Sequence, residues 1–218
     1  MRWWLAVALL GTGSASCAMA SDLLVHLVDS HGTAVDDAVV TLISSEPSPA
    51  RSSPAPAPVT RIIDQRDETF VPYVQMFRPG DRVVFRNSDT TRHHVYSFAS
   101  IKKFEFVLSP GQSSPPMALD TPGVAAVGCN IHDHMITYLF VSAEPLMAVS
   151  NSGGNAAFSH LAPGHYRAQV WHPQLYPGQP QPTQLVIVNP GGAAQRLSFT
   201  LSLIRDPRLP LARRQANY

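Results

Sequence analysis

Residues 128–138 read Gly-Cys-Asn-Ile-His-Asp-His-Met-Ile-Thr-Tyr, which places one thiol, two imidazoles and a thioether within seven residues. Runs typical of β-strands flank this stretch on both sides, so we expect it to form a tight loop. A tight loop can turn Cys129, His132 and Met135 toward one point. Soft sulfur ligands and borderline imidazoles suit copper, whereas Ca²⁺ and Mg²⁺ would want oxygen ligands. The stretch therefore predicts a copper site.

A further strong ligand is expected from a second stretch upstream. The strand-like run 83–87 is followed by the polar residues 88–92 and then by His93 and His94. Because successive side chains of a strand point to opposite faces, only one of these two histidines can face a metal. Two imidazoles and one thiolate, with Met135 as a long axial contact, form the ligand set of a blue copper electron-transfer site.

At these residues the sequence resembles the plastocyanin and amicyanin type of cupredoxin. The spacing Cys129-x-x-His132-x-x-Met135 is similar to the copper loop of amicyanin. Residues 77–87 and the His-x-Val unit at 93–95 resemble the other half of the pattern, where a Gly-Asp turn opens a strand and the histidine is the first ligand.

The likeness to cupredoxins covers residues 60–143. Within it, the phrases Arg-His-His-Val-Tyr-Ser-Phe at 92–98 and Gly-Cys-Asn-Ile-His-Asp at 128–133 resemble exported proteins often labelled methylamine utilization proteins. The resemblance implies a Greek-key cupredoxin sandwich for this part of the chain.

The resemblance also implies a role for each candidate ligand. One type 1 copper ion per chain would be held in a plane by His93, Cys129 and His132, with Met135 in the axial position. His93 is preferred to His94 because it occupies the histidine of the His-x-Val unit.

The loop departs from the usual cupredoxin pattern in two ways. Asp133 stands where a proline is common, and His134 adds another imidazole beside Met135. His134 is therefore an alternative axial ligand, and an imidazole in place of a thioether would change the colour and potential of the site.

The function implied by the resemblance is outer-sphere one-electron transfer rather than enzymatic turnover, with the exposed edge of His132 as the electron port. It implies a redox partner protein, a dehydrogenase or a cytochrome. The alternative is a copper-binding or partner-binding β-sandwich module without redox activity. A nucleophilic enzyme built on Cys129 and His132 is a weaker hypothesis, because no orienting third group or oxyanion cradle is recognisable.

An all-β fold is expected throughout, because Pro, Gly, Asp and Asn punctuate the chain at short spacing and no amphipathic helical run is visible. The central predicted strands are Phe70–Met76, Arg82–Asn87, His94–Ala99, Lys103–Leu108, Val124–Gly128 and Ile136–Ser142. Further strands are predicted before and after them, at Leu23–Val28, Ala38–Ile43, Ala156–Leu161, His165–His172, Gln184–Val188 and Arg196–Ser202.

The segments 21–46 and 144–204 have a resemblance of their own, to carboxypeptidase-regulatory or transthyretin-like sandwiches. The opening Leu-Val-His-Leu-Val-Asp-Ser-His-Gly at 24–32 and the Leu-Ala-Pro-Gly-His-Tyr unit at 161–166 carry it. We therefore expect the cupredoxin unit to be inserted in a second small β-sandwich. The simpler alternative is an N-terminal hairpin added to the cupredoxin sheet and a separate C-terminal sandwich.

The first twenty residues are typical of a secretory signal, with Arg2, the apolar run 3–10 and Ala-Met-Ala at 18–20. We therefore expect export to the periplasm and cleavage after Ala20. Cleavage would remove Cys17 and leave Cys129 without an intramolecular disulfide partner. No other stretch is long enough to cross a membrane as a helix.

Two segments are expected to lie outside the packed cores. Residues 47–59 are proline-rich and predict an extended linker, and residues 205–218 carry four arginines and predict a mobile basic tail. Over the 218 residues, sixteen Lys and Arg face fifteen Asp and Glu. This balance disfavours a nucleic-acid partner, which would call for a basic excess.

Overall fold

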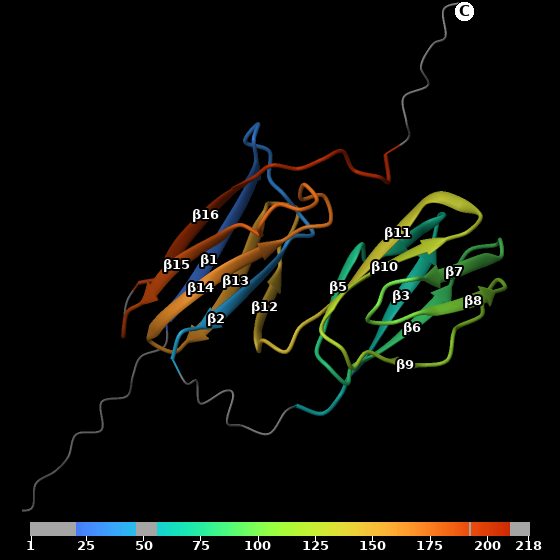
Figure 1. Cartoon of the computed structure of the whole chain (residues 1–218), viewed down its shortest axis with the longest axis horizontal. Coiled ribbons are helices and arrows are strands. Elements are labelled where there is room, and N and C mark those ends of the chain that lie inside the picture. The colour runs from blue at the N-terminus through green and yellow to red at the C-terminus, as the bar shows by residue number, and fades with distance from the viewer. Residues whose placement is uncertain (1–20, 47–55, 192, 210–218) are drawn as a thin grey trace, which may run out of the picture.

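The computed structural model describes residues 21–46, 56–191 and 193–209, and within these ranges every regular element is a β-strand. The strands form two sandwiches that lie side by side (Figure 1). Strands β3 to β11 form one, which we call the inserted sandwich; β1, β2 and β12 to β16 form the other, the host sandwich. The predicted all-β fold with a second small β-sandwich is confirmed.

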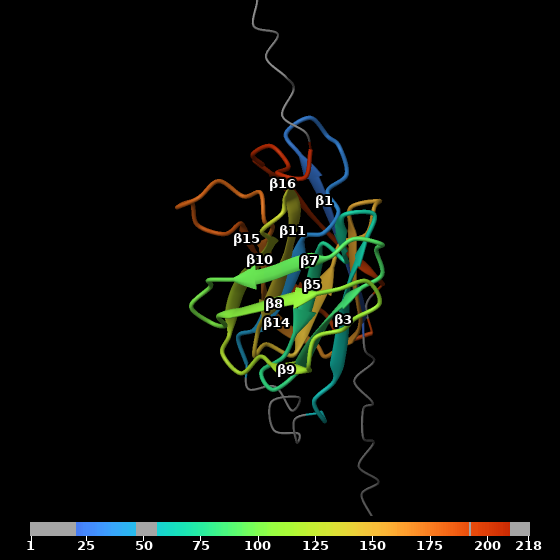
Figure 2. The ribbon, with the colours of Figure 1, turned by 90° about the vertical axis from the view of Figure 1, so that its right-hand side faces the viewer.

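The inserted sandwich consists of a four-stranded sheet in the order β4-β3-β6-β9 and a five-stranded sheet in the order β5-β11-β10-β7-β8. Its strands are β3 (Thr60–Arg66), β4 (Thr69–Val71), β5 (Val74–Phe77), β6 (Arg82–Asn87), β7 (His93–Ser97), β8 (Phe104–Leu108), β9 (Met117–Ala118), β10 (Gly123–Cys129) and β11 (His132–Val141). In Figure 2, β7 and β8 lie in front, on the side turned away from the host sandwich.

The core of the inserted sandwich follows from the alternation of side chains along its strands. On β11, Met135, Thr137, Leu139 and Val141 are buried, and the residues between them face the other side of the sheet. Inward residues of both sheets join in one apolar cluster that includes Cys129. Two of the candidate ligands, Cys129 and Met135, therefore belong to the core of this sandwich.

The host sandwich is assembled from both ends of the chain. Strand β1 pairs with β13 and β16, and β2 pairs with β12 and β14. Neither β1 nor β2 pairs with a strand of the inserted sandwich in the described residues, unlike the added hairpin considered above. The strands are β1 (Ser21–Asp29), β2 (Val39–Ser44), β12 (Leu146–Val149), β13 (Asn155–Leu161), β14 (Gly164–Trp171), β15 (Thr183–Val188) and β16 (Gln195–Leu201).

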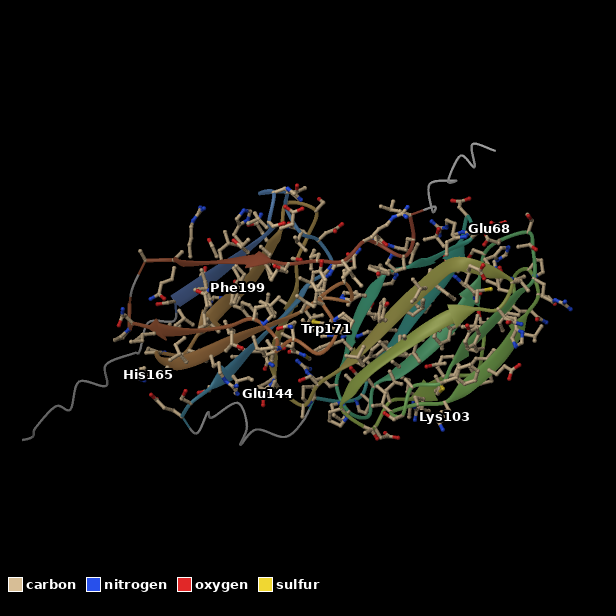
Figure 3. All side chains as sticks on the ribbon, turned by 45° about the horizontal axis from the view of Figure 1, so that its top comes forward. Glu68, Lys103, Glu144, His165, Trp171 and Phe199 are labelled. Carbon is tan, nitrogen blue, oxygen red and sulfur yellow. The ribbon has the colours of Figure 1, made fainter. Side chains whose placement is uncertain are left out.

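An aromatic junction joins the two sandwiches. Trp171 of β14 lies with its ring centroid 5.8 Å from that of Tyr138 and 5.3 Å from that of Phe140, both on β11. Figure 3 labels Trp171 between the two sandwiches. The face of β11 that points away from the core is therefore covered by the host sandwich.

Several strands differ from the sequence predictions. The single strand predicted at Phe70–Met76 is wrong: β4 and β5 are separate and belong to different sheets, with Pro72, which has no N–H to donate, between them. Strands β3, β9 and β12 were not predicted. Strand β3 lacks the clean alternation that marks a half-buried strand, since its residues 60–62 are exposed.

The described part of the predicted tail is in contact with both sandwiches. Arg208 forms an ion pair with Asp206 at 2.7 Å and approaches Asp37 of the host sandwich at 3.7 Å. Its guanidinium carbon lies 3.5 Å from the ring centre of Tyr73. This contact differs from the expectation of a mobile segment from residue 205 onward.

Three sequence predictions fall outside the described residues, wholly or in part. They are the signal segment 1–20, most of the linker, at 47–55, and the end of the basic tail, at 210–218. In the ranges that the structure does describe, there is no helix with the length and hydrophobicity needed to span a membrane.

Candidate metal centre

A two-residue turn brings two of the candidate ligands together. Strand β10 ends at Cys129 and β11 begins at His132, and these two residues are partners in the antiparallel ladder. The predicted tight loop is therefore shorter than expected, because strand pairing continues up to the turn at 130–131. Hairpin pairing places residues with their Cα atoms about 5 Å apart, so the side chains of Cys129 and His132 can meet.

A bulge places the third candidate. Gly128 is paired with Ile136, yet the next residue, Cys129, is paired with His132. The intervening residues of β11 are thus bulged, with Asp133 and His134 exposed and Met135 buried at 2% exposure. Met135 joins the core cluster that contains Cys129, and the predicted axial candidate faces the protein interior.

The upstream histidine comes from the neighbouring strand. Strand β7 pairs with β10, with Val95 opposite Cys129, and this places His93 next to the turn. The His93 side chain is completely buried, and its Nδ1 lies 3.7 Å from Cys129 Sγ. His132 Nδ1 lies 3.8 Å from the same sulfur atom. The ligand atoms of the three residues all lie within 4.8 Å of one another.

These distances fit a single metal ion of the predicted kind. Imidazole and thiolate bonds to a divalent metal are about 2.0–2.3 Å long, so a thiolate sulfur and an imidazole nitrogen bound in one plane would lie about 3.8 Å apart. The two sulfur–nitrogen distances, 3.7 and 3.8 Å, are close to this value. The donor set of one thiolate and two imidazoles also matches the chemistry that favours copper.

The two alternative imidazoles lie outside this cluster. His94 is on the opposite face of β7, where its Nε2 contacts the Glu105 carboxylate and its Nδ1 lies 3.4 Å from the Asn130 amide nitrogen. This follows from the alternation of side chains along a strand. His134 is exposed, and its ring centroid is 6.1 Å from that of His132.

A carboxylate that sequence reasoning missed holds the buried imidazole. Asp89 Oδ2 lies 2.7 Å from His93 Nε2. An ionised carboxylate can only accept a hydrogen bond, so Nε2 carries a proton, and in the neutral imidazole the lone pair of Nδ1 then faces Cys129. Burial pushes the pKa of Asp89 upward, but hydrogen bonds from His93 and from the backbone N–H groups of residues 68 and 67 outweigh it, and the pKa lies below its usual value.

A second missed carboxylate lies beside the other imidazole. Glu68 Oε1 is 3.6 Å from His132 Nε2, the nitrogen that points away from Cys129. The His132 side chain is 18% exposed and that of Glu68 is 52% exposed, and Figure 3 labels Glu68 near one end of the inserted sandwich. Asp89 could have been suspected from its position four residues before His93, whereas Glu68 is far from both ligand stretches in the sequence and carries no such signal.

Comparisons with known proteins give no family assignment. No family model matches the sequence, and no curated protein is similar enough to count as a relative. Among solved structures, the purple cupredoxin from Nitrosopumilus maritimus is 19% identical, with a TM-score of 0.34, and the match covers 37% of this chain and 98% of that one.

Two other solved structures are similar to parts of the chain. A mutant of amicyanin with Cu(I) is 15% identical, with a TM-score of 0.35 and coverage of 38% of this chain and 82% of amicyanin. The copper-containing nitrite reductase from Thermus scotoductus SA-01 is 25% identical, with a TM-score of 0.35 and coverage of 48% and 28%. At such TM-scores these likenesses do not decide a function, which must rest on the site itself.

Proposed function

We propose that this chain is an exported type 1 copper protein that transfers single electrons by an outer-sphere route. The observation that carries the proposal is the convergence of His93, Cys129 and His132, whose ligand atoms lie within 4.8 Å of one another at one end of the inserted sandwich. Bound copper would supply a reversible one-electron couple at this point.

Each ligand has a distinct part in the proposal. Cys129 would bind as the thiolate and His93 and His132 through Nδ1, the atoms that face one another. Met135 is proposed as the axial ligand because it is buried in the same apolar cluster as Cys129, whereas His134 is exposed. The edge of His132 would be the point at which electrons enter and leave, since His93 is fully buried.

Rigidity supports electron transfer over substrate turnover. Cys129 and His132 are paired in a β-ladder and His93 lies on an adjacent strand, so their positions are fixed by the sheet rather than by a long loop. Ligands held in this way need little rearrangement when an electron arrives or leaves. This favours an electron carrier, and we propose that it exchanges electrons with a redox partner protein, a dehydrogenase or a cytochrome.

The remaining parts of the proposal rest on the sequence. Export to the periplasm rests on the signal-like segment 1–20, and membership of the exported proteins labelled methylamine utilization rests on the phrases at 92–98 and 128–133. Likewise, we propose a cupredoxin domain at 60–143, flanked by the two parts, 21–46 and 144–204, of a carboxypeptidase-regulatory or transthyretin-like domain.

The test is to add Cu(II) to the purified mature chain and to record its visible and electron paramagnetic resonance spectra. We expect an intense thiolate-to-copper band and a reversible one-electron wave. Cys129→Ser should abolish the band and His93→Ala should weaken or remove it, whereas the matched variant His94→Ala should keep it. Tight Cu(I) binding with no such band would instead favour a copper-binding module without redox activity, and a band that persists in Cys129→Ser would refute the thiolate assignment.

A further inference from the structure

A strained turn lies beside the candidate metal centre. Strands β3 and β4 are joined by Asp67 and Glu68, and both residues have φ of +52°. Residues other than glycine rarely adopt this left-handed conformation, because their Cβ atom comes too close to the following carbonyl oxygen. The strain persists only where surrounding contacts enforce it, so the turn must be held from outside.

The contact that holds the turn is the carboxylate of Asp89. Its Oδ1 accepts a hydrogen bond from the N–H of Asp67 at 2.6 Å, and its Oδ2 accepts one from the N–H of Glu68 at 3.1 Å. Both strained residues therefore donate their backbone N–H groups to one side chain. Hydrogen bonds to an ionised acceptor are stronger than those between neutral groups, so two of them can offset the strain.

The same carboxylate also fixes the buried imidazole. Asp89 Oδ2 accepts the hydrogen bond of His93 Nε2 at 2.7 Å. Asp89 is itself held in place, because its N–H donates to Asn87 Oδ1 at 2.9 Å. The amide of Asn87, a fully buried residue, in turn donates to the carbonyl oxygens of Thr91 and Leu108.

The turn also brings a carboxylate close to the imidazole of His132. Glu68, the second strained residue, brings its carboxylate to 3.6 Å from His132 Nε2. The two histidines that face Cys129 are therefore backed by two carboxylates, and Asp89 contacts both His93 and the turn that carries Glu68. A displacement of Asp89 must therefore act on both His93 and the turn that carries Glu68.

We infer that Asp89 is a positioning residue that couples the two imidazoles: it orients His93 directly, and it orients His132 through the strained turn at Asp67 and Glu68. The effects that this coupling has on a copper ion rest on the proposed function. The coupling itself is a property of the metal-free protein and can be tested without copper.

The first experiment compares Asp89→Asn with Asp81→Asn in the metal-free full chain. Asp81 is a matched control: its carboxylate is also buried and accepts two backbone N–H bonds, from Val59 and Arg78, but it precedes β6 whereas Asp89 follows β6. The readout is the long-range ¹⁵N–¹H nuclear magnetic resonance spectrum of the imidazoles, which reports the tautomer and environment of each ring.

In this spectrum we expect Asp89→Asn to remove the Nε2-protonated preference of His93 and to shift the ring signals of His132, which Asp89 does not touch. Asp81→Asn should leave both rings unchanged. If a folded Asp89→Asn protein shifted His93 but left His132 as in the wild type, the coupling would be overturned.

A second pair of variants tests the link from the turn, in case Asp89→Asn does not fold. Asp67→Pro removes the N–H that donates a hydrogen bond to Asp89, and it forbids the positive φ. Asp67→Gly keeps this N–H and relieves the strain. Asp67→Pro should shift the rings of both histidines, and Asp67→Gly should shift neither. Equal spectra for the two variants would contradict the inference.

Copper adds a further test once the loaded protein is available. Loss of a carboxylate behind a ligating histidine typically lowers metal affinity by about 10–100-fold, and we expect a fall in this range for Asp89→Asn. Glu68→Gln should have a smaller effect in the wild type and none in Asp89→Asn, because the turn is already released. Additive effects would refute the coupling, whereas a chain that binds no copper would refute the proposed function and leave the metal-free result standing.

Discussion

Both sandwiches consist of two β-sheets, but they bury different kinds of side chain. The host sandwich also buries polar side chains, among them Ser21, Ser150 and His172, but its apolar core cluster contains neither cysteine nor methionine. The inserted sandwich buries Cys129 and Met135 in its core, and at the same end it fully buries His93, Gln65 and Asn87. Burying polar groups costs free energy unless they are paired. The difference teaches that the site is recognisable where core sulfur atoms and fully buried polar side chains gather at one end of a sandwich.

The largest expected effect comes from removing one matched leucine from each core. Leu139 on β11 and Leu27 on β1 are both fully buried, and replacement of either by alanine should lower the free energy of unfolding by about 2–5 kcal/mol. Urea unfolding followed by circular dichroism checks the magnitude. Leu139→Ala should also weaken the copper spectrum, whereas Leu27→Ala should leave it unchanged at 25 °C; equal loss in both would show that the sandwiches do not differ in their support of the site.

The junction should give the next largest effect. Trp171→Ala removes the ring that contacts Tyr138 and Phe140, and we expect a loss of about 2 kcal/mol because this tryptophan is only partly buried. Small-angle X-ray scattering of the folded variant should show a more extended molecule. A profile identical to that of the wild type would mean that the strand connections alone keep the two sandwiches together.

The free energy of unfolding is expected to depend on pH through buried groups near the junction. Burial lowers the pKa of His172 to about 4, and the nearby Asp36, Arg208 and Asp206 alter it less. The unfolded chain takes up this proton near pH 6.5, so the free energy of unfolding should fall as the pH drops from about 6.5 to 4. Burial raises the pKa of Asp37 to about 6, and the protonation of its folded form offsets part of the fall.

Because the two shifts are similar in size and opposite in effect, the net loss for the metal-free wild type should be below about 1 kcal/mol, measured as urea midpoints between pH 7 and 4. Asp37→Asn should make the decline steeper, because the offset is removed, and His172→Gln should make it shallower. If Asp37→Asn and wild-type profiles coincide, the two groups are not linked to folding as described.

The smallest effect is expected at His94, the half-buried histidine next to a candidate ligand. His94→Ala removes only the contacts with Glu105 and Asn130 at the surface, so unfolding should change by less than about 0.5 kcal/mol. The copper spectrum should be unaltered. A lost or shifted band would move the first ligand from His93 to His94.

Much of the candidate site could be predicted because its donors are chemically unusual and closely spaced. The stretch from Cys129 to Met135 predicts a soft-metal site, and strand alternation explains why His93 and His94 point to opposite faces. The bulge at Asp133 and His134 could not be read from the pattern, because it depends on the ladder register between β10 and β11.

The supporting carboxylates escaped prediction for a different reason. Glu68 reaches His132 only because two strands and a left-handed turn place it there, and an exposed glutamate in a turn is ordinary in any sequence. The alternation of Tyr138 and Phe140 along their strand is typical of packing residues, but it does not reveal that their partner is Trp171 of the other sandwich. Contacts of this kind arise from tertiary structure rather than from local pattern.

The entry and exit of the inserted sandwich lie at the same pole. Strand β3 runs from Thr60 toward the turn at Glu68, and β11 runs from His132 to Val141, so both Thr60 and Val141 lie at the end opposite the metal centre. Among the described residues, no sheet contains both a strand from the segment between Thr60 and Val141 and a strand from outside it. The segment between them is therefore a topological cassette, which could be excised, or transplanted into another chain, without breaking a single β-ladder of its host.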